Sequence, residues 1–217
     1  RDLVRSRGLG DVYKRQDLIP EETCVFTLTH EGYIKRTTLD TYQAQNRGGR
    51  GVQGMTQKDE DFTEEMYVGS THDYMLFLTN QGRVYRLKGY QVPEGSRTAK
   101  GSHIVNLLQL QEGEKVTLML QQKADVDEDN TYATMITKQG LIKRTPLSHF
   151  RNIRKAGLIA IALNEGDSLV WSHLTKGDDE IIVATHDGAA IHFTEDDARA
   201  CLLYSSPSPR DRTRSRM

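Results

Sequence analysis

Seven consecutive residues combine glycine and arginine in a way that suits contact with a polyanion. They are Gln45, Asn46, Arg47, Gly48, Gly49, Arg50 and Gly51. Glycine lets the backbone take positive φ and approach another molecule closely, and the planar fork of arginine matches the oxygens of a phosphate. None of the seven side chains is apolar, so the stretch does not belong to a hydrophobic core. A solvated turn with incidental charge is the alternative that so short a motif leaves open.

Side chains that could support catalysis or hold a metal are not grouped in this sequence. The histidines are dispersed, and Cys24 by itself provides no metal-ligand spacing. There is no phosphate-binding Walker loop and no Gly-x-Ser-x-Gly nucleophile motif. No tyrosine is distinguished as a nucleophile. We therefore expect a binding module without catalytic residues, a metal site or a cofactor of its own.

The two ends of the chain differ from the middle. Residues 1–16 and 201–217 are rich in arginine and lack a hydrophobic period. Codons for Cys201 to Tyr204 can be the reverse complement of part of those for Val12 to Gln16, as in a translated sequencing adapter. We therefore expect residues 1–16 and 200–217 to be non-native and exclude them from the fold. Native disordered tails are the alternative.

Charge and composition limit the function further. Nine of the 29 basic and three of the 30 acidic residues lie in those ends, so residues 17–200 have 20 basic and 27 acidic residues, net −7. This acidic balance argues against indiscriminate nucleic-acid binding but allows a local basic stripe. Cys24 is the only cysteine outside the ends, which fits a reducing cytoplasm. No apolar run approaches the roughly 20 residues that span a bilayer, so no membrane partner is expected.

An internal repeat sets the expected architecture. Four segments share Thr, two residues, Gly, three residues and then a basic residue, with glycines at Gly32, Gly82, Gly140 and Gly188. β-rich runs lie on both sides of each glycine, which predicts a hairpin whose turn needs positive φ. A second glycine follows the first three hairpins, at Gly51, Gly101 and Gly157, and further apolar runs come after it.

These units predict an all-β fold of propeller blades. Each holds about four short strands in roughly 50 residues, the size of a blade, with a further strand at 104–108 in the second unit and at 158–163 in the third. We expect blades at about 22–70, 72–121, 131–175 and, in part, 179–199, within a domain at 17–199. Closed propellers have about four to eight blades, so the chain is expected to be a piece of a longer domain. A Greek-key sandwich stays open as a less regular alternative.

Cations recur at equivalent places in the units. After the hairpin glycines come Lys35, Arg36, Arg83, Arg86, Lys143 and Arg144; before the second glycines come Arg47, Arg50, Arg97, Lys100, Arg154 and Lys155. Equivalent positions recur at one height on successive blades, which predicts a basic track for a polyanion, with the acidic loops away from it. Ordinary solvated strand faces, whose cations protect edges from aggregation, are the alternative.

Several of these segments resemble one known family. Gln45 to Gly51 resembles the gyrase box, Gln-Arg-Arg-Gly-Gly-Arg/Lys-Gly, although Asn46 stands where the family usually has arginine. GYIKRT at 32–37, SRTAKG at 96–101 and GLIKRTPL at 140–147 also look like the C-terminal domain of the A subunit of bacterial DNA gyrase. The resemblance covers nearly all of residues 17–199.

The resemblance implies a six-bladed β-pinwheel in which neighbouring blades exchange a strand, here with about three and a half blades. It implies a basic rim that wraps double-stranded DNA and supports negative supercoiling by a cytoplasmic, nucleoid-associated A2B2 holoenzyme of two A and two B subunits. The cleaving tyrosine, and the ATP and Mg²⁺ that the holoenzyme uses, belong to other parts of that enzyme. All the cations above and the box residues are then DNA-binding candidates.

Two alternatives to this function remain. The C-terminal domain of topoisomerase IV has a degenerate or missing box, so Gln45 and the run from Gly48 to Gly51 favour gyrase. A protein-binding propeller of the WD or kelch kind is less favoured, because Trp171 is the only tryptophan and is followed by serine.

Overall fold

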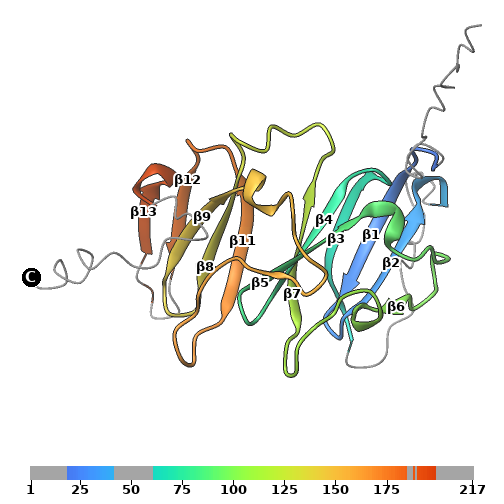
Figure 1. Cartoon of the computed structure of the whole chain (residues 1–217), viewed down its shortest axis with the longest axis horizontal. Helices are drawn as coiled ribbons and strands as arrows, with labels where there is room; N and C mark the ends of the chain where they lie inside the picture. Colours follow the sequence, from blue (N-terminus) through green and yellow to red (C-terminus); the bar gives the residue numbers. More distant parts are fainter. Residues whose placement is uncertain (1–18, 42–60, 185–187, 189, 199–217) are drawn as a thin grey trace, which may run out of the picture.

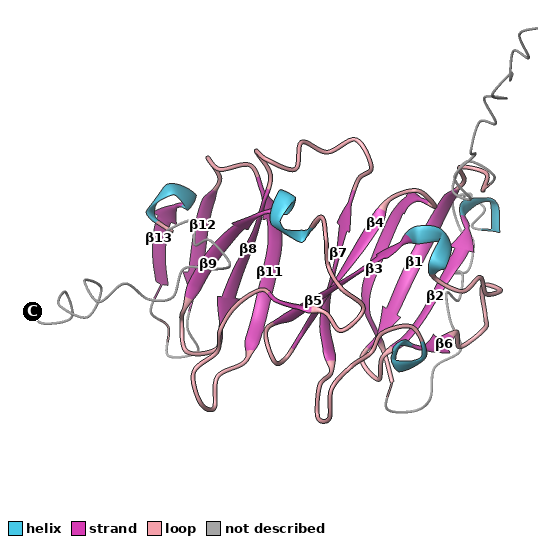
Figure 2. Cartoon of the chain, in the orientation of Figure 1, coloured by secondary structure: helices cyan, strands magenta, loops and turns pink. Residues whose placement is uncertain are grey.

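The computed structural model describes residues 19–41, 61–184, 188 and 190–198. Both predicted non-native ends and the Gln45–Gly51 stretch lie outside these residues. Within the described part the structure is all-β, with short 3-10 turns between strands (Figures 1 and 2). The all-β prediction is confirmed.

The first sheet is built mainly from the first repeat. Strands β1 (Thr23–Thr29) and β2 (Tyr33–Thr38) form an antiparallel hairpin, and β3 (Thr63–Ser70) pairs with the other edge of β1. A short strand from the second repeat, β6 (Ser102–His103), pairs with β2 and completes the order β3-β1-β2-β6. The first sheet therefore borrows its outermost strand from the repeat that follows.

The second sheet has the same plan. The hairpin of β4 (Tyr74–Thr79) and β5 (Arg83–Lys88) pairs with β7 (Val116–Gln122) on one side. On the other side β5 pairs with β10 (Leu158–Ile159), which comes from the third repeat. The exchange of a strand between neighbouring blades, implied by the family resemblance, is thus observed twice.

Two strands differ in position or length from the sequence prediction. The strand expected at 104–108 lies instead at Ser102–His103 and belongs to the preceding sheet, whereas Ile104–Asn106 forms the 3-10 turn η4. Likewise the expected strand at 158–163 is limited to Leu158–Ile159. The apolar residues Ile104 and Ile161 are buried without being in strands, so hydrophobicity alone overestimated the strand lengths.

The third sheet has three strands and the last a single hairpin. Strands β8 (Tyr132–Thr137), β9 (Ile142–Pro146) and β11 (Leu169–Thr175) are arranged in the order β11-β8-β9. Strands β12 (Glu180–Ala184) and β13 (Ala190–Thr194) pair with each other. Figure 1 shows the sheets side by side in chain order along the long axis, from β1 at the blue end to β13 at the red end.

Further 3-10 turns follow the hairpins in the described part of the chain. They are η2 (Leu39–Thr41), η3 (Gly89–Gln91), η5 (Leu147–Phe150) and η6 (Glu195–Asp197). Each comes directly after the second strand of its hairpin and starts the loop that leads away from it. Three of these turns, η3, η5 and η6, lie at or next to residues that contact cationic side chains from the preceding repeat.

The core is divided between successive sheets. On β4, Met75 and Phe77 belong to a cluster shared with the first sheet, whereas Leu76 and Leu78 belong to a cluster shared with the third. Alternate side chains of a strand point to opposite faces, so both faces of the second sheet are covered. This explains why β4 reads as a continuous apolar run instead of an alternating one.

The Thr-x-x-Gly repeat has a structural cause in the first three hairpin turns. The hydroxyls of Thr29, Thr79 and Thr137 accept the backbone N–H groups four residues later, at distances of 3.1, 3.2 and 3.1 Å. The turn glycines have φ values of 86°, 73° and 83° in the three hairpins. Threonine and glycine therefore recur because both are needed to close the turn.

Candidate nucleic-acid interface

Lys35, predicted to lie on an exposed basic track, is instead enclosed by protein. It lies in the middle of β2 with 0% of its surface exposed. Its Nζ donates to the backbone carbonyls of Ser96, Arg97 and Ala99. Removal from water lowers the pKa of the ammonium, since burial disfavours the charged form. This corrects the predicted position of Lys35, because its ammonium is hydrogen-bonded inside the protein and does not lie on the surface.

Arg36, the next residue of β2, is directed to the same part of the second repeat. Its Nε donates to the carbonyl of Val92 at 2.9 Å, and its Nη2 lies 3.2 Å from Glu94 Oε2. The side chain is only 17% exposed, whereas that of Glu94 is 60% exposed. Most of the Arg36 guanidinium therefore interacts with residues of the neighbouring repeat.

Arg86 occupies the equivalent position in the second hairpin. Its Nη1 donates to the carbonyls of Phe150 and Arg151 at 3.1 and 3.0 Å, and its Nη2 lies 3.3 Å from Glu128 Oε1. The guanidinium lies over the ring of Tyr74, 3.4 Å from the centroid, a favourable cation–π arrangement. With 8% of the side chain exposed, Arg86 also differs from the predicted surface position.

The remaining strand cations follow the same trend. Arg144 donates to Asp196 Oδ1 at 3.1 Å and lies over the ring of Tyr132, with 13% of its side chain exposed. Lys143 Nζ donates to the carbonyl of Ala160 at 2.7 Å. Arg83 donates through Nη2 to the carbonyl of Ala156. The predicted track on the hairpin strands is therefore mostly an internal network of cations.

The cations of the loops have a different environment. Arg154 and Lys155 are exposed, and Arg97 and Lys100 are partly exposed. The Lys100 ammonium lies 3.7 Å from the centroid of the Tyr33 ring. These four predicted site residues shortly precede Gly101 or Gly157, and Arg154 and Lys155 are the most exposed cations of the predicted set within the described residues.

One carboxylate lies among the cations, contrary to the expectation that the acidic loops lie away from them. Glu128, in the acidic loop between β7 and β8, approaches Arg151 Nε at 2.7 Å through Oε2 and Arg86 through Oε1. The hydrogen bond from Arg151 to Glu128 raises the pKa of Arg151. Glu128 thus neutralises part of the charge at this loop.

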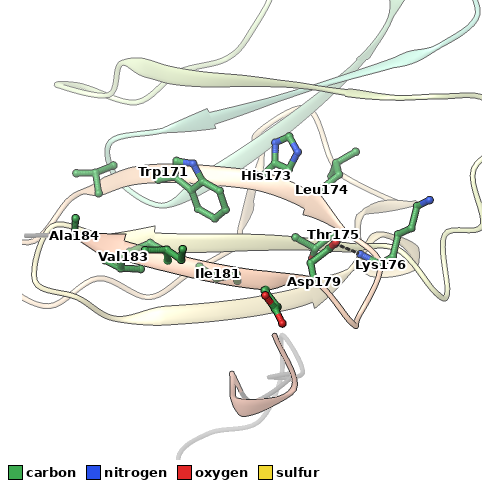
Figure 3. Close-up of a pocket in the computed structure, with 13 residues that line it drawn as sticks. Trp171, His173, Leu174, Thr175, Lys176, Asp179, Ile181, Val183 and Ala184 are labelled. Carbon is green, nitrogen blue, oxygen red and sulfur yellow. Dashed lines mark hydrogen bonds between the residues drawn. The ribbon is translucent and has the colours of Figure 1, made fainter. Parts of the chain in front are cut away.

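A cavity of about 690 Å³ lies elsewhere, between β11 and β12 (Figure 3). Apolar side chains such as Trp171 and Val183 line it together with His173 and Asp179. Asp179 Oδ2 accepts the backbone N–H of Lys176 at 2.9 Å. None of the predicted site residues lines this cavity, and no cluster of potential metal ligands occurs among the described residues. The described helices also include none long and apolar enough to cross a membrane.

Comparison with known sequences identifies the family. Residues 25–68, 73–123 and 132–176 match the DNA gyrase C-terminal domain, beta-propeller family. The chain belongs to this family. The matched segments correspond closely to the first three sheets, which confirms the propeller class and the family resemblance.

Gyrase proteins from individual bacteria are similar over most of the chain. The A subunit of DNA gyrase from Clostridium acetobutylicum is 53% identical over 184 residues, which cover 85% of this chain and 22% of that protein. Its counterpart from Halalkalibacterium halodurans is 49% identical over 189 residues, 87% of this chain and 22% of its own length. The chain therefore spans about a fifth of these relatives.

Solved structures give the same architecture. The C-terminal domain of DNA topoisomerase IV aligns with a TM-score of 0.70 at 30% identity, covering 85% of this chain and 55% of that one. A DNA gyrase A C-terminal domain aligns with a TM-score of 0.64 at 28% identity, covering 83% and 57%.

Sequence reasoning missed the residues that hold the strand cations. The rings of Tyr74 and Tyr132 lie against Arg86 and Arg144, and Glu128 bridges two arginines. A signal was present, because both tyrosines stand eight residues before their hairpin glycine. Glu128 had no such signal, since it lies in a loop without a counterpart in the other repeats.

Proposed function

We propose that this chain is part of the DNA-binding and DNA-wrapping module in the A subunit of DNA gyrase, which supports ATP-dependent negative supercoiling. Membership of the gyrase C-terminal domain family is the observation that carries this proposal. The partly exposed cations on a loop of the second repeat and the exposed cations on the equivalent loop of the third repeat support it. Wrapping relies on backbone contacts and DNA deformation, and needs no base-specific contacts.

The partners follow from the same proposal. Double-stranded DNA contacts this module, whereas the other members of an A2B2 assembly, one A and two B subunits, contact other parts of the protein. The module itself holds no cofactor, and ATP and Mg²⁺ act elsewhere in the holoenzyme. The location is the cytoplasm, at the nucleoid.

Binding of a labelled duplex to the intact A subunit, measured against salt concentration, tests DNA contact. Each neutralised phosphate contributes about −0.9 to the slope of log K against log salt. A steep negative slope is expected. Binding that does not respond to salt, or no binding, would contradict the proposal.

The Gln45–Gly51 stretch gives a sharper test, although it lies outside the described residues. Arg47→Ala combined with Arg50→Ala in the holoenzyme should abolish wrapping and supercoiling but spare relaxation and decatenation. Unchanged supercoiling would refute the role of this stretch. Asn46→Arg, which restores the family's usual cation, should leave wrapping equal or stronger.

The C-terminal domain of topoisomerase IV is the second candidate, favoured by the TM-score of 0.70. The variant Arg47→Ala with Arg50→Ala distinguishes the two functions, because a different activity is expected to change in each case. A gyrase module loses supercoiling, whereas a topoisomerase IV module has no supercoiling activity to lose and changes in decatenation instead.

A further inference from the structure

Two loops that carry exposed or partly exposed cations are attached to the preceding repeat in the same manner. Loop 92–101 follows η3 and leads into β6, and loop 150–157 starts at the end of η5 and leads into β10. Both end at a glycine with positive φ, Gly101 at 86° and Gly157 at 75°. Both then supply the outermost strand of the preceding sheet.

Loop 92–101 is attached to β2 through its carbonyl groups. Lys35 Nζ donates to the carbonyls of Ser96, Arg97 and Ala99. The hydroxyl of Thr37 donates to the carbonyl of Gly95 at 3.1 Å. Because these carbonyls are turned toward β2, the loop is fixed by its backbone, and the Lys100 ammonium adds a contact with the ring of Tyr33 on the same strand.

Loop 150–157 is attached to β5 in the same way. Arg86 donates to the carbonyls of Phe150 and Arg151, and Arg83 donates to that of Ala156. The two arginines therefore hold both ends of the loop. Between these ends lie the exposed cations Arg154 and Lys155.

We propose that Lys35, Arg83 and Arg86 are positioning residues for DNA wrapping: they fix the loops whose exposed or partly exposed cations contact phosphate, and do not contact DNA themselves. This inference rests on the proposed function. Each repeat thereby fixes the position of the cations on the loop of the next repeat. Hydrogen bonds between the repeats then determine the relative position of successive phosphate contacts.

The physical reason lies in the cost of bending DNA. A bend is a deformation that the protein must offset with contacts to the backbone of the duplex. A cation offsets part of that cost only if it lies next to a phosphate of the bent duplex. Supporting residues must therefore hold each contacting cation in a fixed position. Loss of a positioning residue should reduce the bend more than it reduces the number of ions released.

Two substitutions that each remove one positive charge separate the two roles. In the intact A subunit, Arg86→Gln removes a loop attachment, whereas Arg154→Gln removes an exposed cation of the same loop. Lys138→Gln, at the exposed turn of the third hairpin, is the control for loss of charge alone. The measurements are the salt slope of binding and energy transfer between dyes on the ends of a duplex of about 150 base pairs, one persistence length.

Arg86→Gln should keep the wild-type salt slope and lose energy transfer at saturating protein. Arg154→Gln should make the slope shallower by about 0.9, the value of one phosphate contact. Lys138→Gln should change neither quantity. A slope shallower by about 0.9 in Arg86→Gln, with energy transfer unchanged, would overturn the inference by showing a direct contact.

A conservative variant covers the case in which Arg86→Gln does not fold. Arg86→Lys retains the charge but cannot bind two carbonyls and Glu128 with a planar fork. Reduced energy transfer in Arg86→Lys supports positioning, and wild-type transfer overturns it. Salt-independent binding by the wild-type protein would instead contradict the proposed function, so the two failures are distinguishable.

Discussion

The ammonium of Lys35 lies 3.0 Å from the carbonyl oxygen of Ala99, a residue of the following repeat. Two more carbonyls of the same loop accept from this Nζ. A lysine is rarely enclosed unless it is paired or hydrogen-bonded, because burial of an unpaired charge is costly. Here backbone carbonyls provide the compensation, and the lysine joins two repeats.

Replacing Lys35 by methionine should lower the free energy of unfolding by about 2–4 kcal/mol. The apolar stem is retained, but the three carbonyls of Ser96, Arg97 and Ala99 lose a charged donor. Urea unfolding of the chain followed by circular dichroism measures the change. Lys115→Met, at an exposed lysine, is the control and should stay within about 0.5 kcal/mol of the wild type. An equal effect of the two substitutions would contradict the structural role of Lys35.

The pair Tyr85 and Glu114 should make stability fall at high pH. The Tyr85 hydroxyl donates to Glu114 Oε2 at 2.9 Å, and burial followed by this carboxylate raises the pKa of Tyr85 to about 12. The unfolded chain loses the phenol proton near pH 10, whereas the folded chain retains it until about pH 12. The stabilisation is therefore complete below pH 10 and is lost as the pH rises from 10 to 12.

Tyr85→Phe isolates this contribution. From about pH 10 upward the wild type should lose about 1.4 kcal/mol per pH unit more than the variant. Unfolding by urea at several pH values between about 9 and 11 measures the difference. Other groups with raised pKa values, such as Tyr67, contribute equally to both proteins. Parallel pH profiles would show that Tyr85 is not responsible.

Gly101 and Gly140 should differ in their tolerance of alanine, although both have positive φ. A Cβ at Gly101 would lie 2.5 Å from the carbonyl oxygen of Ile34, whereas a Cβ at Gly140 would meet nothing within 4 Å. Gly140→Ala should therefore cost only the backbone strain of about 1–2 kcal/mol, and Gly101→Ala should cost clearly more. Thermal unfolding compares the two. Equal costs would indicate that the loop moves away from β2 without penalty.

Much of this fold could be predicted from the sequence because the repeat carries the turn chemistry. The Thr-x-x-Gly pattern, as at Thr79 and Gly82, indicates a hairpin each time it occurs. The hydrogen bond from the Arg83 backbone N–H to the Thr79 hydroxyl explains its spacing. The exchanged strands were harder to place. β6 has only two residues, Ser102 and His103, and nothing local indicates that its partner lies in the preceding repeat.

The burial of the strand cations was predicted less well than the fold. A repeated cation on a strand has the same sequence pattern whether it faces solvent or the next blade. Arg86 differs from the exposed Arg154 because it donates to the carbonyls of Phe150 and Arg151, a contact that only the structure shows. Carbonyl groups belong to every residue, so the sequence contains no sign of such a partner.

Glu128 should weaken DNA binding in the wild-type protein, given the proposed function. Its carboxylate lies 2.7 Å from Arg151 Nε, and a DNA phosphate must compete with it for that guanidinium. Glu128→Gln removes the charge but keeps an oxygen that can accept from Arg86. The intact A subunit carrying Glu128→Gln should bind a duplex more tightly at low salt, with a slope steeper by up to about 0.9 as Arg151 becomes available. Asp125→Asn, in the same acidic loop and exposed, is the matched control because it changes the overall charge by the same amount. It should leave the slope unchanged. If both variants gave the same slope, the effect would be one of net charge, and Arg151 would have no part in the interface.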